Sequence, residues 1–215
     1  MDVDPRLYEQ IVIKDNDIHS IILSYLVHNC YKETVESFVT WTGGGRSADN
    51  VVDMEKRKRI ANCAIDGNAL TAIELTEELA PALLEHNRDL HFDLLGLHFV
   101  ELICSKKSTE ALEFAQTKLR PFGDVPKYVE KLQDFMALLA YEEPEKSPMF
   151  HLLSMEYRQQ VTDKLNRAIL ANANQPSFPA MERLIQQIVA VRQCLQKDFS
   201  KDGLPPFSLE DFMKE

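Results

Sequence analysis

The amino-acid sequence predicts an all-α fold, a helical hairpin followed by a helical bundle. Apolar residues recur at intervals of three and four along most of the chain, which is the period of an amphipathic helix. Only 7 of the 215 residues are glycine, few for a fold that depends on many tight turns. No convincing stretch alternates apolar and polar residues in the way that a half-buried strand does.

The first helical pattern follows a polar run, and Asn16 or Asp17 is its expected N-cap. The apolar residues behind this cap are spaced by three and four. They are Ile18, Ile21, Ile22, Tyr25 and Leu26. This spacing places them in one stripe along a helix. Residues 1–16 are interpreted as an N-terminal extension ahead of it.

A break near Cys30 separates this helix from a second, shorter one, which we expect to end before Trp41. The apolar residues of the second helix are Tyr31, Val35, Phe38 and Val39. Residues 17–42 are therefore predicted to form a helical hairpin. Three glycines follow it and have the composition of a flexible linker, assigned to residues 43–50. A phosphate-binding loop is the alternative, but the preceding strand and the loop lysine are missing.

Residues 51–107 are predicted to form the next group of helices. Gly67 is expected to end one helix, Asn68 to begin the next, and Pro81 to occupy the first turn of a third. Residues 90–104 are apolar on almost every side. Such a helix is typically central, because water would contact apolar side chains on any face left open.

Residues 108–199 are predicted to form the last group of helices. Ser108 is expected to cap the first of them, and Ser147 and Pro148 to be the cap and first residue of a later one. Residues 200–215 contain charges and two consecutive prolines without a sustained period. They are interpreted as a flexible tail.

Composition and charge exclude some classes of function. There are 24 basic and 34 acidic side chains, and the net charge of −10 repels polyanions, so nucleic acid is not an expected partner. Charges interrupt the apolar stretches well before the ~18 residues needed to cross a bilayer. The acidic N-terminus lacks the apolar core of a signal peptide. We expect no membrane association and a soluble, intracellular protein.

The sequence offers no convincing site for chemistry. Its cysteines are far apart, as reduced thiols usually are, and are Cys30, Cys63, Cys104 and Cys194. His91 and His98 share a helix face but supply only two of the three or four ligands of a zinc site. The motifs of serine hydrolases, zinc proteases and nucleotide-binding loops are missing. We therefore predict no catalytic residue, no cofactor and no metal ion.

The basic run at residues 56–59 has two interpretations. It is either the solvated side of an amphipathic helix or a patch for nuclear import. The hairpin raises a different question, because its 26 residues carry two apolar faces and are too few for a core of their own. Those faces are buried either by a distant part of this chain or by a second copy. We favour dimerisation, and a single helical bundle is the alternative.

The hairpin resembles a LisH motif, in which an apolar residue, Tyr-Leu, a Gly-aromatic pair, Ala and Phe follow one another. The residues that carry the resemblance, and that we assign to subunit contact, are Ile18, Ile21, Ile22, Tyr25, Leu26, Tyr31, Val35 and Phe38. Cys30 stands where that family usually has Gly, and Val35 where it usually has Ala. Segments beginning at Arg57 and Asn87 resemble a CTLH segment, and those beginning at Glu110 and Leu138 resemble a CRA segment.

The chain is accordingly identified as a member of the LisH–CTLH–CRA family. The resemblance implies an all-helical, non-catalytic scaffold or adaptor subunit of a multi-subunit CTLH-type E3 ubiquitin ligase for proteasomal degradation. It implies sister LisH–CTLH–CRA partners, including RING-bearing and Ran-binding-protein-like subunits, together with a substrate receptor, in a homo- or hetero-oligomer. It also implies localisation in cytoplasm and nucleus.

The same resemblance implies how the contacts are divided. The LisH and C-terminal CRA helices would pair with a sister subunit, and the CTLH and N-terminal CRA helices would form another contact. The alternative is a stand-alone LisH dimerising adaptor in cytoskeletal or Ran-linked transport. An all-helical enzyme with an unrecognised site is a third hypothesis.

Overall fold

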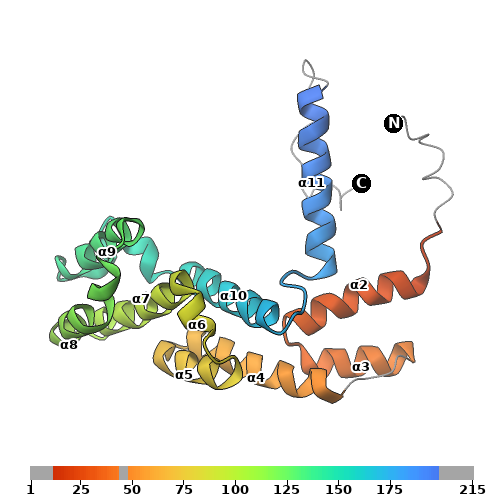
Figure 1. Ribbon diagram of the computed structural model, residues 1–215, viewed down its shortest axis with the longest axis horizontal. Coiled ribbons are helices and arrows are strands. Elements are labelled where there is room, and N and C mark those ends of the chain that lie inside the picture. Colours follow the sequence, from red (N-terminus) through yellow and green to blue (C-terminus); the bar gives the residue numbers. More distant parts are fainter. Residues whose placement is uncertain (1–11, 44–47, 199–215) are drawn as a thin grey trace. The chain divides into compact units, whose positions relative to one another are not determined.

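The computed structural model describes residues 12–43 and 48–198, with side chains from residue 53 to residue 194 in the second range. Every regular element in these ranges is a helix (Figure 1). The prediction of an all-α fold is confirmed. The predicted tail at residues 200–215 and most of the predicted extension at residues 1–16 lie outside the described residues.

The chain divides into two compact units. One contains residues 1–54 and 178–215, so the first and last parts of the sequence belong together, and the other contains residues 55–177. The helix α4 (Ala48–Ile65) contributes residues to both units. It begins at Ala48, within the segment that the sequence analysis assigned to a linker, so that this assignment is wrong for its last residues.

The hairpin consists of α2 (Asp15–His28) and α3 (Lys32–Thr42). The helix α2 begins before both predicted caps, because Lys14 is the N-cap and its backbone N–H donates to Asp17 Oδ2 at 3.0 Å. The helix α3 continues past Trp41, and Gly43 then ends it in the left-handed conformation, with φ 68°. Trp41 therefore lies on the last turn of a helix, contrary to the prediction.

The turn between α2 and α3 has a left-handed residue, Cys30, with φ 58°. This is the conformation that glycine adopts most easily, which is the physical reason for glycine at this position in LisH motifs. The Cys30 side chain is buried in the small core of the hairpin. That core also contains Val35, Val39 and Met54. Burial of the thiol offsets part of the cost of the left-handed backbone.

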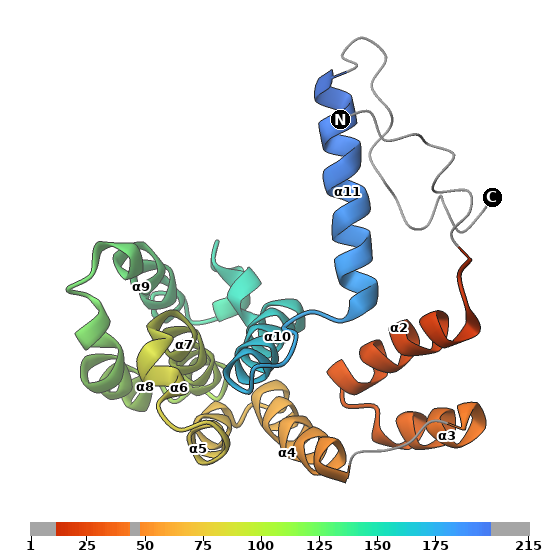
Figure 2. The same ribbon diagram turned by 45° about the vertical axis from the view of Figure 1, so that its right-hand side comes forward.

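The last helix, α11 (Ala180–Asp198), belongs to the same unit and packs against α2 (Figure 2). The hydroxyl of Ser24 on α2 accepts a hydrogen bond of 3.0 Å from the backbone N–H of Ala180, 156 positions away. This N–H belongs to the first turn of α11, where helix donors lack partners within the helix. A distant part of the chain therefore does contact the hairpin.

The second unit surrounds one central helix, α7 (Arg88–Cys104), ten of whose residues are buried. The helices on one side of it are α4, α5 (Ala69–Leu79), α6 (Leu83–His86) and α10 (Met155–Asn172). On the other side lie α8 (Ser108–Phe114), the π-helix η1 (Ala115–Leu119), the short 3-10 helices η2 (Arg120–Phe122) and η4 (Phe150–Leu153), and α9 (Pro126–Leu139). A further 3-10 helix, η3 (Pro144–Lys146), precedes η4. The prediction of a central helix at residues 90–104 is confirmed.

Three predicted helix starts are wrong in detail. Pro81 lies in the turn before α6, whose N-cap is Ala82. Ser108 is the first residue of α8 and not its cap. Ser147 accepts from the N–H of Met149 in a turn, whereas the cap of α10 is Ser154, which accepts from the N–H of Tyr157 at 3.1 Å. In each case a nearby residue takes the capping position, since the sequence offers several candidates within a few residues.

Arg158 joins three helices of the second unit. Its Nη1 donates to the carbonyl oxygen of Ile65 at the end of α4 (2.9 Å) and to Glu101 Oε1 on α7 (3.1 Å). Gly67 follows α4 with φ 92°, and a Cβ there would lie 2.9 Å from Glu101 Oε1. The predicted end of this helix at Gly67 is confirmed. The ion pair between Arg158 and Glu101 leaves no room for a side chain at position 67.

The basic run at residues 56–59 lies on α4. Lys56, Lys58 and Arg59 are exposed, as on the solvated side of an amphipathic helix. Arg57 is only 3% exposed, and its Nη1 donates to Asn166 Oδ1 on α10 at 2.7 Å. One of the four basic side chains therefore serves the packing of α4 on α10 and is not displayed to solvent.

We expect Gly96→Ala to lower the free energy of unfolding by about 1–3 kcal/mol, because overpacking forces the neighbouring side chain to move. A Cβ at Gly96 would overlap the Phe135 ring of α9. Helix propensity alone predicts the opposite sign, since alanine is the better helix former. Urea unfolding measures the change. The loss should shrink in a Phe135→Leu background, and an equal loss in both backgrounds would contradict the proposed contact.

We expect Arg158→Met to lower the free energy of unfolding by about 2–3 kcal/mol, since it leaves a largely buried carboxylate and a helix-end carbonyl without their donor. Glu101→Gln should restore part of this loss in the double variant. The control is Lys107→Met, which removes the exposed ion pair with Glu110 and should cost well under ~1 kcal/mol. Equal losses for Arg158→Met and Lys107→Met would show that the buried pair stabilises nothing.

Candidate subunit interface

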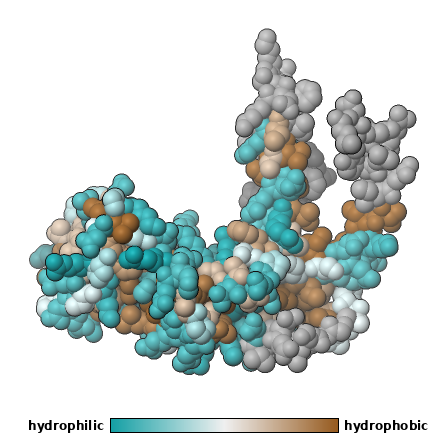
Figure 3. Space-filling model, in the orientation of Figure 1, coloured by the Kyte–Doolittle hydropathy of each residue, from teal (hydrophilic) through white to brown (hydrophobic). Residues whose placement is uncertain are grey.

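Exposed apolar side chains are concentrated in the first unit. Of the seventeen large apolar side chains that are exposed in the described residues, ten belong to this unit, although it is the smaller one. They are Val12, Ile13, Ile18, Tyr25, Tyr31, Trp41, Met181, Leu184, Ile188 and Val191. Figure 3 shows hydrophobic patches along α11 and at the start of α2. Exposed apolar side chains concentrated in this way typically mark a protein–protein contact.

The helix α11 carries an apolar stripe that the described part of the chain leaves exposed. Met181, Leu184, Ile188 and Val191 follow one another at intervals of three and four, and all are exposed. Residues at these intervals lie on one face of a helix. An exposed apolar stripe of this length is typical of a surface against which another helix packs.

The helix α2 is also incompletely packed, because none of its residues is fully buried. Ile18 and Tyr25 are seven positions apart, two helical turns, and are 47% and 39% exposed. Tyr31, in the turn after α2, has its ring 6.3 Å from that of Tyr25. The outward side of the hairpin therefore displays an aliphatic and two aromatic side chains close to one another in sequence.

An aromatic cluster lies near the last turn of α3. The Trp41 ring is 5.4 Å from His19 and 5.9 Å from Phe38, and His19 and Phe38 are 5.6 Å apart. Trp41 is 75% exposed and is the one tryptophan in the sequence. Tryptophan is enriched among the residues that contribute most to protein–protein binding. Trp41 is not among the predicted contact residues, because the helix was expected to end before it.

The structure places the predicted contact residues in three settings. Ile18, Tyr25 and Tyr31 are exposed. The half-buried members are Ile21, Ile22 and Phe38. Leu26 packs against the hairpin core, and Val35 lies within it. Both of these inward residues therefore stabilise the hairpin itself, and the role of the outward ones in subunit contact stays a prediction.

The chemistry available to this surface is that of apolar contact. Within residues 12–43 and 48–198, no group of three or more His, Cys, Asp or Glu side chains is placed to hold a metal ion. None of the helices described is long and apolar enough to cross a membrane. The described part of the first unit thus presents helices whose apolar sides another protein surface would cover.

Comparison with known proteins relates the chain to one family. Residues 53–196 match the family described as CTLH/CRA C-terminal to LisH motif domain. A protein of Nematostella vectensis called "Glucose-induced degradation protein 8 homolog" is 32% identical over 80% of this chain and 77% of its own length. A protein of the same name from Dictyostelium discoideum is 30% identical over 85% of this chain and 80% of its own. "GID complex subunit 8" of Schizosaccharomyces pombe is 29% identical over 74% of this chain and 70% of its own.

We expect Ile18→Asp to weaken self-association or association with a partner chain about a hundredfold or more, because a carboxylate would be buried unpaired in the contact. The fold should persist, since Ile18 is exposed in the isolated chain. Light scattering at micromolar concentration measures the mass, and far-ultraviolet circular dichroism checks the helices. Emission from Trp41 should shift to the red when a contact that covers it is lost.

The control is Ser20→Asp, which adds the same charge on α2. Ser20 is exposed and lies two positions from Ile18, which is about 200° around the helix and so on the other side. It should leave association unchanged. If Ile18→Asp associates as tightly as Ser20→Asp, the outward side of α2 is not the contact.

Proposed function

Since this chain belongs to the family with the CTLH/CRA C-terminal to LisH motif domain, we propose that it is a non-catalytic scaffold subunit of a multi-subunit CTLH-type E3 ubiquitin ligase. The observation that carries the proposal is the open apolar surface on α2, α3 and α11. The name of the fission-yeast relative, "GID complex subunit 8", supports it. A scaffold needs surfaces for partners more than it needs a reactive group.

The architecture suits a subunit that contacts more than one neighbour. The first unit brings α2 and α11, from opposite parts of the sequence, into contact, and apolar side chains on both helices are exposed in the described residues. The second unit has two larger cores on the two sides of α7 and is a folded body in itself. In our proposal the first unit pairs with a sister chain and the second unit holds another component.

The partners that we propose are sister LisH–CTLH–CRA chains, among them RING-bearing and Ran-binding-protein-like subunits, together with a substrate receptor. Ubiquitin transfer is assigned to the RING-bearing partner, and this chain positions it. We further propose that the assembly acts in both cytoplasm and nucleus. The outcome would be delivery of bound substrates to the proteasome.

Ubiquitylation with purified components tests the assignment. The chain mixed with activating enzyme, conjugating enzyme and ubiquitin should form no ubiquitin chains, because the RING-bearing partner is missing. Addition of a RING-bearing sister chain should give activity that depends on association, and Ile18→Asp should reduce it while Ser20→Asp should not. Robust ubiquitin chain formation by this protein alone would contradict the proposal.

Affinity purification with mass spectrometry gives a second test. RING-bearing chains should co-purify with the wild-type protein and with Ser20→Asp. Recovery of tubulin or dynein components without any RING-bearing chain would favour a stand-alone adaptor of the cytoskeleton.

A further inference from the structure

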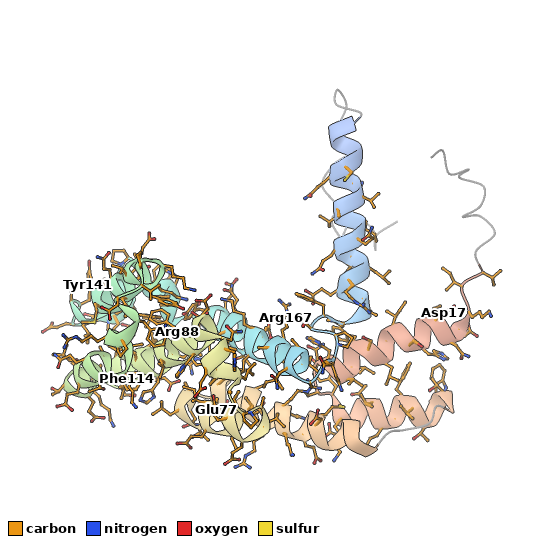
Figure 4. The ribbon with its side chains drawn as sticks, in the orientation of Figure 1. Asp17, Glu77, Arg88, Phe114, Tyr141 and Arg167 are labelled. Carbon is orange, nitrogen blue, oxygen red and sulfur yellow. The ribbon has the colours of Figure 1, made fainter. Side chains whose placement is uncertain are left out.

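The second unit contains a groove of about 800 Å³ that the function above does not use. Its walls come from α5, α6, α7, α8, η1 and η2, all within residues 55–177. Figure 4 labels two of the lining residues, Arg88 on α7 and Phe114 on α8. The groove is therefore formed by elements that the central helix α7 holds in one body.

The groove has an apolar floor. Leu84 and Leu95 are buried in the two cores beneath it, and Ile73, Phe114 and Phe122 complete the apolar lining. Leu70 on α5 also lines the groove but is 38% exposed, so it offers apolar surface to an occupant. An apolar floor with a few polar groups around it is the usual composition of a binding site.

The backbone is unusual on two sides of the groove. One wall contains the π-helix η1, which supplies Thr117 and Lys118. Single π turns are rare and are frequent at functional sites. Directly before α6, Ala82 has φ 63°, and its N–H donates to Glu77 Oε2 at 3.2 Å. Left-handed non-glycine residues also cluster at ligand-binding sites.

Two groups that carry or can take positive charge lie beside Phe122, and Lys118 lines the same groove. The Arg88 guanidinium lies 5.4 Å above the Phe122 ring, and the His91 ring is 6.0 Å from it, edge-on. Burial, with Lys118 and Arg88 nearby, lowers the pKa of His91, against the opposite effect of Glu77. Within the part of the chain that the structure describes, no ion pair includes Arg88 or Lys118.

This arrangement determines what the groove fits. A carboxylate beside Arg88 and Lys118 would form ion pairs with them, and a large apolar side chain would cover the apolar residues at the bottom of the groove. Glu74 and Glu85, on α5 and α6, also line the groove and would repel a segment that is acidic throughout. Charge complementarity thus favours an apolar segment with its acidic group on the side of α7 and η1.

We propose that this groove binds a short segment of a partner protein that inserts a leucine or aromatic side chain over Leu84, Leu95 and Phe122. An acidic residue of the same segment pairs with Arg88 and Lys118. The inference deepens the scaffold role proposed above, since it assigns the second unit a docking site and gives the chemistry of its ligand. It does not depend on the contact made by α2 and α11.

The test uses a phage-displayed library of random 12-residue peptides, selected against the full chain. Enriched peptides should carry a large apolar residue within a few positions of Asp or Glu. A labelled copy of the most enriched peptide should bind the Arg88→Glu/Lys118→Glu variant about tenfold more weakly or worse, because two attractive charges become repulsive. Leu70→Ser should also weaken binding, through loss of apolar contact on the rim.

The matched control is Arg59→Glu/Lys146→Glu, which makes the same change of charge at two exposed residues outside the groove and should bind the peptide as the wild type does. Ile18→Asp should bind it equally well, so that failure of the scaffold contact and failure of the groove are distinguishable. No enrichment, enrichment of basic peptides, or equal binding to both charge variants would overturn the proposal. A fall in oligomer mass of unliganded Arg88→Glu/Lys118→Glu would assign the groove to a second copy and overturn it too.

Discussion

The second unit is organised by one constraint, that α7 cannot face water on any side. A helix with apolar residues all round must be enclosed, and two groups of helices enclose it, each with a core of its own. On one side the approach is closest at Gly96, where the Phe135 ring of α9 occupies the space of a missing side chain. The cost of a glycine within a helix is thus offset by the aromatic contact that it permits.

The same helix also fixes its neighbours through charge. Asp93 is buried on α7, and a buried carboxylate is stable only with partners. Lys131 of α9 and Lys164 of α10 both pair with it, so α9 and α10 are held on α7 by one carboxylate. Arg158 pairs with Glu101 and also binds the end of α4. These polar contacts fix the positions of α4, α9 and α10 relative to α7, which apolar packing alone leaves undetermined.

The sequence is sufficient to predict what depends on local pattern. The all-apolar residues 90–104 and the glycine after Ile65 have consequences that any fold must respect, and both predictions are confirmed. Capping is harder, because Ser147 and Ser154 are equally good caps until tertiary contacts decide. The inward positions of Leu26 and Val35 were not predictable, since a stripe spaced by three and four spans a broad arc of the helix. The groove needs six elements, one of them the π-helix η1, and no residue pattern predicts how they come together.

The two units differ in how much buried apolar surface each has to stabilise its own fold. Each side of α7 has a core of thirteen buried residues, whereas the described part of the first unit contributes four, Cys30, Val35, Val39 and Met54. Hydrophobic stabilisation grows with buried apolar area, so this unit gains little from its own interior. The hydrogen bond from Ala180 to Ser24 orients α11, but it leaves the stripes of both helices open. A partner that covers them binds only the folded hairpin and therefore stabilises it by mass action. If a partner covers these stripes as proposed, its binding and the folding of the first unit are thermodynamically linked, whereas the two larger cores of the second unit lie within its own helices.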